Sequence, residues 1–134
     1  MKKLFFIYLT LVLIISGCDT GQSMEAVIIN SSSQKVKVNF VSSEISELNK
    51  TLEIDPNQQG LYVAFQSGTS GVFLTFVDND SIYIQDSSNE VLKIFKEGSQ
   101  GKNIYNVDEN WEVTEPSKNH FVYSFTITNE DLDN

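Results

Sequence analysis

The sequence predicts an all-β domain, a mostly antiparallel β-sandwich of about seven to nine short strands. Three observations support this prediction. Apolar and polar residues alternate with a period of two, turn residues separate the alternating segments at short intervals, and no stretch beyond residue 25 shows a sustained helical stripe. Short strands without helices between them favour a sandwich or a small barrel, and because no pattern indicates barrel closure we expect the sandwich.

The alternation that predicts strands is clearest in two segments. Apolar residues occupy every second position of residues 36–40 and of residues 121–127, as a strand with one buried face requires. Residues 73–77 are apolar on both faces, so we expect this segment at the centre of a sheet. The other expected strands cover residues 26–29, 61–66, 72–77, 81–85 and 91–95, with weaker patterns at 51–54, 104–107 and 111–114.

Turn residues predict the connections between these strands. Residues 67–71 contain two glycines and residues 78–80 are Asp-Asn-Asp, so each stretch is expected to close a hairpin. At the C-terminus, Thr128 followed three residues later by Asp131 predicts a short helical turn. Further turns are expected at residues 55–57 and 97–101.

The first 17 residues have the three parts of a secretory signal peptide. Lys2 and Lys3 form a basic start, residues 4–15 are apolar and uncharged, and Ser16 and Gly17 are small. A helix that crosses a bilayer needs about 20 apolar residues, so this shorter run favours a cleaved leader over a permanent transmembrane helix.

The end of the leader reads Ile15-Ser16-Gly17-Cys18, which resembles the bacterial lipobox. The resemblance implies transfer of diacylglycerol to the Cys18 thiol, cleavage before Cys18, and acylation of the new amino terminus, with palmitate as a typical chain. An ordinary secretory signal with an incidental cysteine is the alternative. We therefore expect a signal peptide over residues 1–17, a flexible tether over 18–25 and a single β-rich domain over 26–134, held at a membrane by two or more acyl chains.

Two further stretches carry a broader resemblance. Residues 28–32 and residues 123–132 look like parts of the small uncharacterised envelope lipoproteins of Bacteroidetes-type bacteria, a family that supplies no known activity. An acid close to the lipidated cysteine is an export cue in such lipoproteins, whereas resemblance to enteric lipoproteins would imply retention at the inner membrane. Because Asp19 follows Cys18, the outer membrane is favoured over the inner one.

The composition of the processed chain restricts its partners. Without Lys2 and Lys3, seven lysines face 18 acidic residues, a formal charge of −11, and the chain has no arginine. Nucleic acid is therefore not an expected partner, and anionic lipid surfaces are poor ones. Since Cys18 is the single cysteine, its lipidation leaves no thiol for a disulfide, a metal or a nucleophile.

No motif in the sequence indicates catalysis, a metal site or a cofactor. His120 is the single histidine and no serine beside it has a nucleophile-elbow pattern. HExxH and CxxC are absent, and the two glycines of residues 98–102 are too close together for a P-loop. We therefore expect no catalytic residue, no metal and no cofactor.

Two residues are candidates for other kinds of site. Trp111 lies among acids and amides and is a candidate ligand contact, by stacking on a sugar or anchoring a partner, although the pattern favours a half-buried sheet tryptophan. Asp80-Ser81-Ile82 resembles the three-residue O-glycosylation signal of Bacteroidetes envelope proteins, which makes Ser81 a candidate modification site.

These observations favour a non-enzymatic, lipid-anchored envelope protein that binds an unknown protein or glycan partner. The alternative is an inhibitor or immunity protein, because a small acidic domain would be steered toward a basic toxin or hydrolase. A third reading is a glycan hydrolase that uses two carboxylates.

Overall fold

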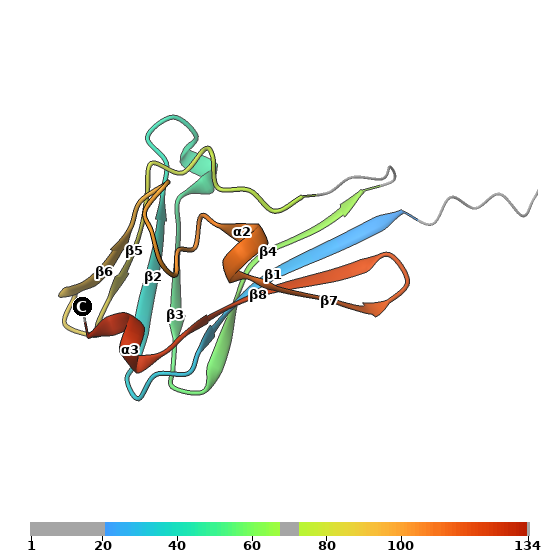
Figure 1. Ribbon diagram of the computed structural model, residues 1–134. Coiled ribbons are helices and arrows are strands. Elements are labelled where there is room, and N and C mark those ends of the chain that lie inside the picture. The colour runs from blue at the N-terminus through green and yellow to red at the C-terminus, as the bar shows by residue number, and fades with distance from the viewer. Residues whose placement is uncertain (1–20, 68–72, 134) are drawn as a thin grey trace, which may run out of the picture.

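The computed structural model describes residues 21–67 and 73–133, which form two four-stranded β-sheets packed against each other (Figure 1). Sheet A has the strand order β4-β1-β8-β7, and sheet B has the order β3-β2-β5-β6. The all-β sandwich with a short C-terminal helix is therefore confirmed. The strands are β1 (Gln22–Asn30), β2 (Val36–Val41), β3 (Lys50–Ile54), β4 (Gln58–Ser67), β5 (Ser81–Gln85), β6 (Val91–Phe95), β7 (Glu112–Ser117) and β8 (His120–Ile127), and the short helices are η1 (Ser46–Leu48), α2 (Val107–Asn110) and α3 (Asn129–Leu132).

Neighbouring strands run antiparallel with one exception, the pair β1 and β8. These two strands run parallel in the middle of sheet A, in a register that extends from Ser23 opposite His120 to Asn30 opposite Ile127. Parallel neighbours need a long crossover connection, and here sheet B lies within that connection. The first and last strands of the domain therefore hold each other in place.

The two segments with the clearest alternation are strands, as predicted. In β2, Val36 and Val38 are fully buried and Phe40 is nearly so, while the intervening Lys37 is partly exposed. In β8, Phe125 is buried on the same face as the buried Ile127 of that strand. Apolar residues at every second position thus supply the inner faces of both sheets.

The predicted tether is shorter than expected, because β1 begins at Gln22 rather than near Ala26. Met24 is only 5% exposed and faces the core, as Ala26 does, whereas Glu25 between them lies on the opposite face. The period of two therefore extends back into residues that polar composition alone assigned to the tether. Residues 1–20, with the predicted leader and Cys18, lie outside the described residues.

The prediction of a central strand at residues 73–77 is wrong. This segment has no strand partner in the described chain, although its side chains alternate. Leu74 and Phe76 are buried, whereas Phe73 is 79% exposed and Val77 is 71% exposed. The segment is apolar on both faces, but only the face with Leu74 and Phe76 packs on the core, and the face with Phe73 and Val77 is left uncovered. The hairpin predicted through residues 78–80 therefore does not form, although a turn near residue 78 does lead into β5. The other predicted hairpin turn, at residues 67–71, lies outside the described residues from residue 68 onward.

Two weaker predictions have different outcomes. Residues 104–107 form a turn that enters α2 instead of a strand, because Ile104 is fully buried as a single apolar anchor within a polar loop. The strand expected at 111–114 exists as β7 but begins one residue later, at Glu112.

Aromatic rings join the two sheets across the core. Phe40 of sheet B stacks on Tyr62 of sheet A with ring centroids 4.0 Å apart. Phe76 lies 5.4 Å from Tyr62 and 5.6 Å from Trp111, and Trp111 lies 5.5 Å from Phe125. Residues 73–77 thus contribute Phe76 to the core cluster even though their backbone is outside both sheets.

The predicted C-terminal helical turn is present as α3 and is fixed by Asp131. Its carboxylate accepts a hydrogen bond from the Thr128 backbone N–H at 2.8 Å, which is part of a capping box, and a second one from the Lys102 ammonium at 2.5 Å. Burial acts to raise the pKa of Asp131, but the hydrogen bonds from Lys102 and Thr128 outweigh burial and lower it. Lys102 also lies 5.5 Å from the centre of the Phe125 ring, so it links α3 to the core.

We expect Asp131→Asn to lower the free energy of unfolding by about 1 kcal/mol at pH 7, because it removes a charged cap. A carboxylate with a lowered pKa in the folded state stabilises the protein above its ordinary pKa, and this contribution is lost as the pH falls through the folded-state value. Urea unfolding at several pH values should therefore show a constant difference from wild type above pH ~5 that narrows below pH ~4. Asp133→Asn, the same change on an exposed neighbour, is the control, and an equal effect there would contradict the role of Asp131.

Candidate functional site

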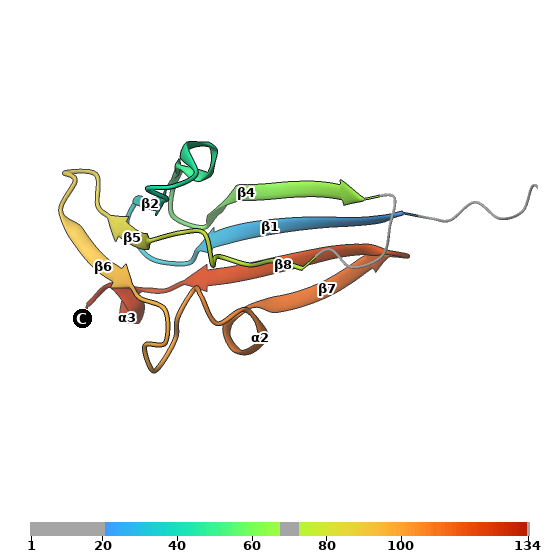
Figure 2. The same ribbon diagram turned by 90° about the horizontal axis from the view of Figure 1, so that it is seen from above.

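Sheet A has an open end that sheet B does not cover. β1 and β4 are 9 and 10 residues long, whereas β3, β5 and β6 of sheet B have 5 residues each. Figures 1 and 2 show the strands of sheet A continuing past sheet B toward the start of β1. The inner face of this open end is therefore free to be covered by another part of the chain or by a partner.

Residues 73–77, here called the edge segment, run across this open end. The backbone groups of residues 73–75 make no hydrogen bond to any described residue, while the Phe76 carbonyl accepts from the Asn79 N–H at 2.9 Å. The Val77 N–H reaches the Thr75 hydroxyl at 3.4 Å. The edge segment thus alternates in burial like a strand as far as Phe76 and enters a turn at Val77. It is anchored by Leu74 and Phe76, and the backbone of its first three residues has no partner among the described residues.

A groove of about 480 Å³ lies on one side of the edge segment. We call it the β4-side groove. Buried Met24 lies opposite Phe65 in the β1–β4 register, and Phe65 is itself 50% exposed. The remaining lining is mainly apolar and includes Tyr62, Val63, Phe73 and Leu74.

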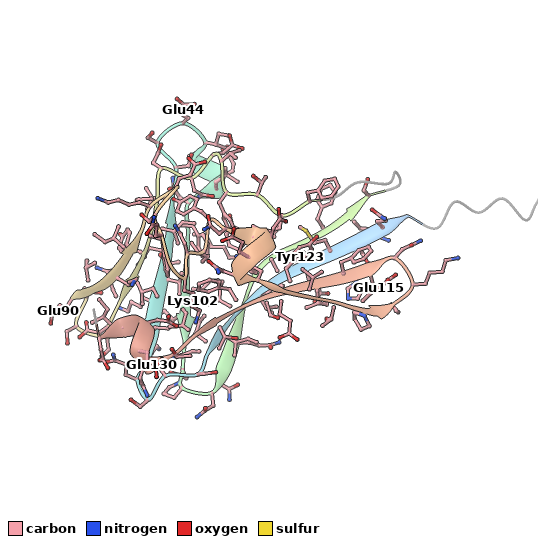
Figure 3. The ribbon with its side chains drawn as sticks, in the orientation of Figure 1. Glu44, Glu90, Lys102, Glu115, Tyr123 and Glu130 are labelled. Atoms are coloured by element: carbon pink, nitrogen blue, oxygen red, sulfur yellow. The ribbon has the colours of Figure 1, made fainter. Side chains whose placement is uncertain are left out.

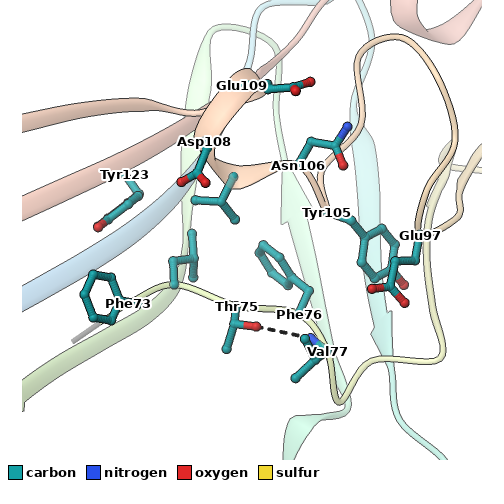
Figure 4. Close-up of a pocket in the computed structure, with 12 residues that line it drawn as sticks. Phe73, Thr75, Phe76, Val77, Glu97, Tyr105, Asn106, Asp108, Glu109 and Tyr123 are labelled. Carbon is teal, nitrogen blue, oxygen red and sulfur yellow. Dashed lines mark hydrogen bonds between the residues drawn. The ribbon is translucent and has the colours of Figure 1, made fainter. Parts of the chain in front are cut away.

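A cleft of about 500 Å³, the α2-side cleft, lies on the other side of the edge segment (Figure 4). It combines aromatic rings with carboxylates, and no lysine is among the described residues that line it. Asp108 of α2 points toward the edge segment, whereas the neighbouring Glu109 points away from it. The rings are those of Phe73, Phe76, Tyr105 and Tyr123, and the carboxylates are those of Glu97, Asp108 and Glu109.

Tyr105 fixes the far end of this cleft. Its hydroxyl donates to the Asn79 carbonyl at 3.1 Å, which ties the loop before α2 to the turn that follows the edge segment. Burial raises the pKa of Tyr105, and the negative charges of Glu97 and Asp80 raise it further. The cleft is therefore a region of negative potential beside aromatic surface, a combination that attracts cations.

Carboxylates are not confined to this cleft. Figure 3 shows Glu44 at the top of the molecule, Glu115 on the right, and Glu90 and Glu130 at the lower left. What distinguishes the α2-side cleft is that its carboxylates adjoin aromatic rings and an unpaired stretch of backbone. In the described part of the chain, no cluster of three or more acidic, histidine or cysteine side chains could hold a metal ion.

Trp111 does not serve as the candidate ligand contact, because the structure buries it. The side chain is 6% exposed, lies between Phe76 and Phe125, and donates its indole N–H to the Ile104 carbonyl at 2.8 Å. The polar neighbours that suggested exposure belong to α2 and to the exposed strand β7. Trp111 is therefore a core residue beneath the cleft.

Ser81 is the first residue of β5 and is half-buried. It pairs with Val41, and the strand alternation places it on the face opposite the buried Ile82. Ser81 follows the cleft-lining Val77 by four residues but does not itself line the cleft. Its O-glycosylation stays a prediction.

Sequence reasoning missed one polar pair, Ser23 with His120. The two residues face each other across β1 and β8, and the Ser23 hydroxyl lies 2.7 Å from His120 Nδ1. No described carboxylate is hydrogen-bonded to the imidazole, so the third group that orients a catalytic histidine is not in place. Because the pair depends on a parallel register between the first and last strands, no local sequence pattern could have indicated it.

Cys18 and the predicted leader lie outside the described residues. Within the described part of the chain, no helix has the length and apolar character needed to cross a bilayer.

Comparison of this chain with protein-family models, with curated proteins and with solved structures finds no match. The described residues therefore define the class on their own: an eight-stranded β-sandwich whose open sheet end is crossed by an unpaired segment between an apolar groove and an acidic, aromatic cleft.

Proposed function

We propose that this chain is a lipid-anchored protein of the bacterial cell envelope, at the outer rather than the inner membrane, and that it acts as a non-enzymatic binding module. The leader and the lipobox resemblance at Cys18 support the anchor. The observation that carries the binding role is the edge segment, where Phe73 and Val77 are largely exposed beside two hollows. Exposed apolar surface of this kind is typical of an interaction site.

The anchor would place this surface close to a membrane. Three residues separate Cys18 from Gln22, where β1 begins. A fully extended chain spans at most about 14 Å over that interval. The partner would therefore meet the module at or near the membrane surface.

The anchor is tested by producing the full chain in a bacterial host and measuring the intact mass of the membrane-extracted protein. We expect residues 18–134 with added diacylglycerol and an acyl chain. The Cys18→Ser variant should lack the lipid mass. A wild-type product with a free thiol at Cys18, or one that still carries residues 1–17, would contradict the anchor.

The binding role is tested by site-specific crosslinking in the cells that make the protein. A photoreactive residue in place of Val77, which is 71% exposed, should give a discrete adduct. The same residue in place of Ser87, in the exposed turn between β5 and β6, is the matched control and should give none. Identical adduct patterns at the two positions would contradict a specific binding face.

A second candidate is an inhibitor or immunity protein directed at a basic envelope toxin or hydrolase. The acid-lined cleft and the charge of the processed chain favour it. Electrostatic steering makes association rates fall steeply with ionic strength. An association rate that does not change with salt would count against this candidate.

A further inference from the structure

We propose that the partner presents an extended, basic segment of a protein, which binds in the α2-side cleft as an added strand along the edge segment. This inference rests on the proposed binding role and names the chemical class of the partner. The bound segment would pair its backbone with residues 73–75 and place basic side chains at alternate positions.

The backbone at the start of the edge segment is open to a partner strand. Residues 73–75 are extended, flank a hollow and make no backbone hydrogen bond to a described residue. Buried Leu74 and Phe76 hold this stretch in place, so it is already ordered before a partner arrives. An ordered, unpaired edge beside an open hollow is the arrangement to which an extended peptide adds as a strand.

The charge of the α2-side cleft favours a basic segment. Glu97, Asp108 and Glu109 line the cleft without a lysine among the described lining residues. An inward-facing side chain of the added strand would lie near Asp108 and the Tyr123 ring, which border the same hollow. Lysine or arginine suits this position, because a carboxylate and an aromatic face both attract a cation.

The exposed side chains of the edge segment favour apolar residues at the partner's alternate positions. Successive side chains of a strand point to opposite faces, so the partner's other residues would lie beside the exposed Phe73 and Val77. Apolar cross-strand pairs stabilise such neighbours. The partner segment is therefore expected to alternate basic and apolar residues where it lies along the edge segment.

The probe is a synthetic heptapeptide that alternates lysine and valine, and its control alternates glutamate and valine. Titrated into the full chain in uncharged detergent at low salt, the lysine peptide should bind saturably and about tenfold more tightly than the glutamate peptide. Equal binding of the two peptides would overturn the basic-segment inference.

Backbone pairing is tested on the peptide rather than on the protein. Successive backbone N–H groups of a strand point to opposite edges. Methylating the backbone nitrogens of the lysine residues therefore blocks one edge of the peptide, and methylating those of the valine residues blocks the other edge. One pattern should weaken binding about tenfold while the other leaves it nearly unchanged. Equal effects of the two patterns would overturn strand addition.

The position of the site is tested with Asp108→Asn, which should weaken lysine-peptide binding about threefold and flatten its salt dependence. Glu90→Gln removes one charge at the other end of the domain (Figure 3). It should change neither the affinity for the lysine peptide nor the salt dependence of that affinity. Equal weakening by both variants would overturn the site, as would self-association of the chain through the cleft in sedimentation experiments.

These outcomes are independent of the tests of the proposed function. A lipidated chain that crosslinks at Val77 but ignores the lysine peptide keeps the envelope binding role and loses the basic-segment inference. A chain that binds the peptide without lipid at Cys18 keeps the inference and loses the anchor.

Discussion

Phe76→Ala is expected to lower the free energy of unfolding by about 3–5 kcal/mol, the usual cost of emptying a buried phenylalanine site. Phe76 is 3% exposed and its ring lies within 6.2 Å of those of Phe40, Tyr62, Tyr105 and Trp111. The same change at Phe73, which is 79% exposed, should alter the free energy of unfolding by less than about 0.5 kcal/mol. Urea unfolding followed by circular dichroism measures both.

This matched pair distinguishes two structures for residues 73–77. In a strand at the centre of a sheet, both phenylalanines would be buried and both substitutions would be costly. In the observed edge segment only Phe76 is buried. Comparable losses at the two positions would therefore contradict the edge segment and, with it, the exposed binding face.

The parts of the fold that the sequence predicts well are those with one buried face. In β2, Val36, Val38 and Phe40 alternate with polar residues, and this local pattern by itself requires a buried face and an exposed face. The cap of α3 is equally local, since Thr128 and Asp131 lie within one turn. Such features depend on neighbours in the chain and need no knowledge of the rest of the fold.

The edge segment could not be predicted in this way. Alternating burial at Leu74 and Phe76 has the same period whether or not the backbone has a partner strand. Whether the edge segment has a partner strand depends on which strands reach the open end of sheet A. The strands that reach it are set in part by the parallel register of β1 and β8. A sequence window contains no information about that register.

The α2-side cleft is also a product of tertiary structure. Its lining comes from residues 73–77, Glu97, residues 105–109 and Tyr123, which are separated along the chain. Trp111 was a candidate contact because its neighbours are polar, yet the fold buries the indole, and Asp108 lines the cleft instead. Composition thus predicted an acidic domain. It did not predict the place where carboxylates, aromatic rings and the backbone of residues 73–75 lie next to one another.

Asn30→Ala is expected to destabilise the domain by about 3 kcal/mol, because it leaves several polar groups without partners at a junction of the two sheets. Asn30 is fully buried at the end of β1. Its amide N–H groups donate to the carbonyls of Gln34 at 2.8 Å and Ile54 at 2.9 Å, and its oxygen accepts from the Ser32 N–H at 3.0 Å and the Ser32 hydroxyl at 2.6 Å. Gln59→Ala, at an exposed position of β4, is the control and should have little effect.

Asn30→Asp separates the loss of hydrogen bonds from the loss of volume. The variant side chain has nearly the same shape but cannot donate to both carbonyls, and its charge would be buried, so we expect a loss of stability at pH 7 at least as large as that of Asn30→Ala. Burial raises the pKa of an introduced carboxyl in the folded state, so its penalty should shrink as the pH falls and the group becomes protonated. Urea unfolding at pH 4 and pH 7 would show this recovery for Asn30→Asp relative to Asn30→Ala. If Asn30→Asp loses little stability at both pH values while Asn30→Ala is strongly destabilised, Asn30 acts through its volume, and the hydrogen-bonded junction is not what holds the two sheets together.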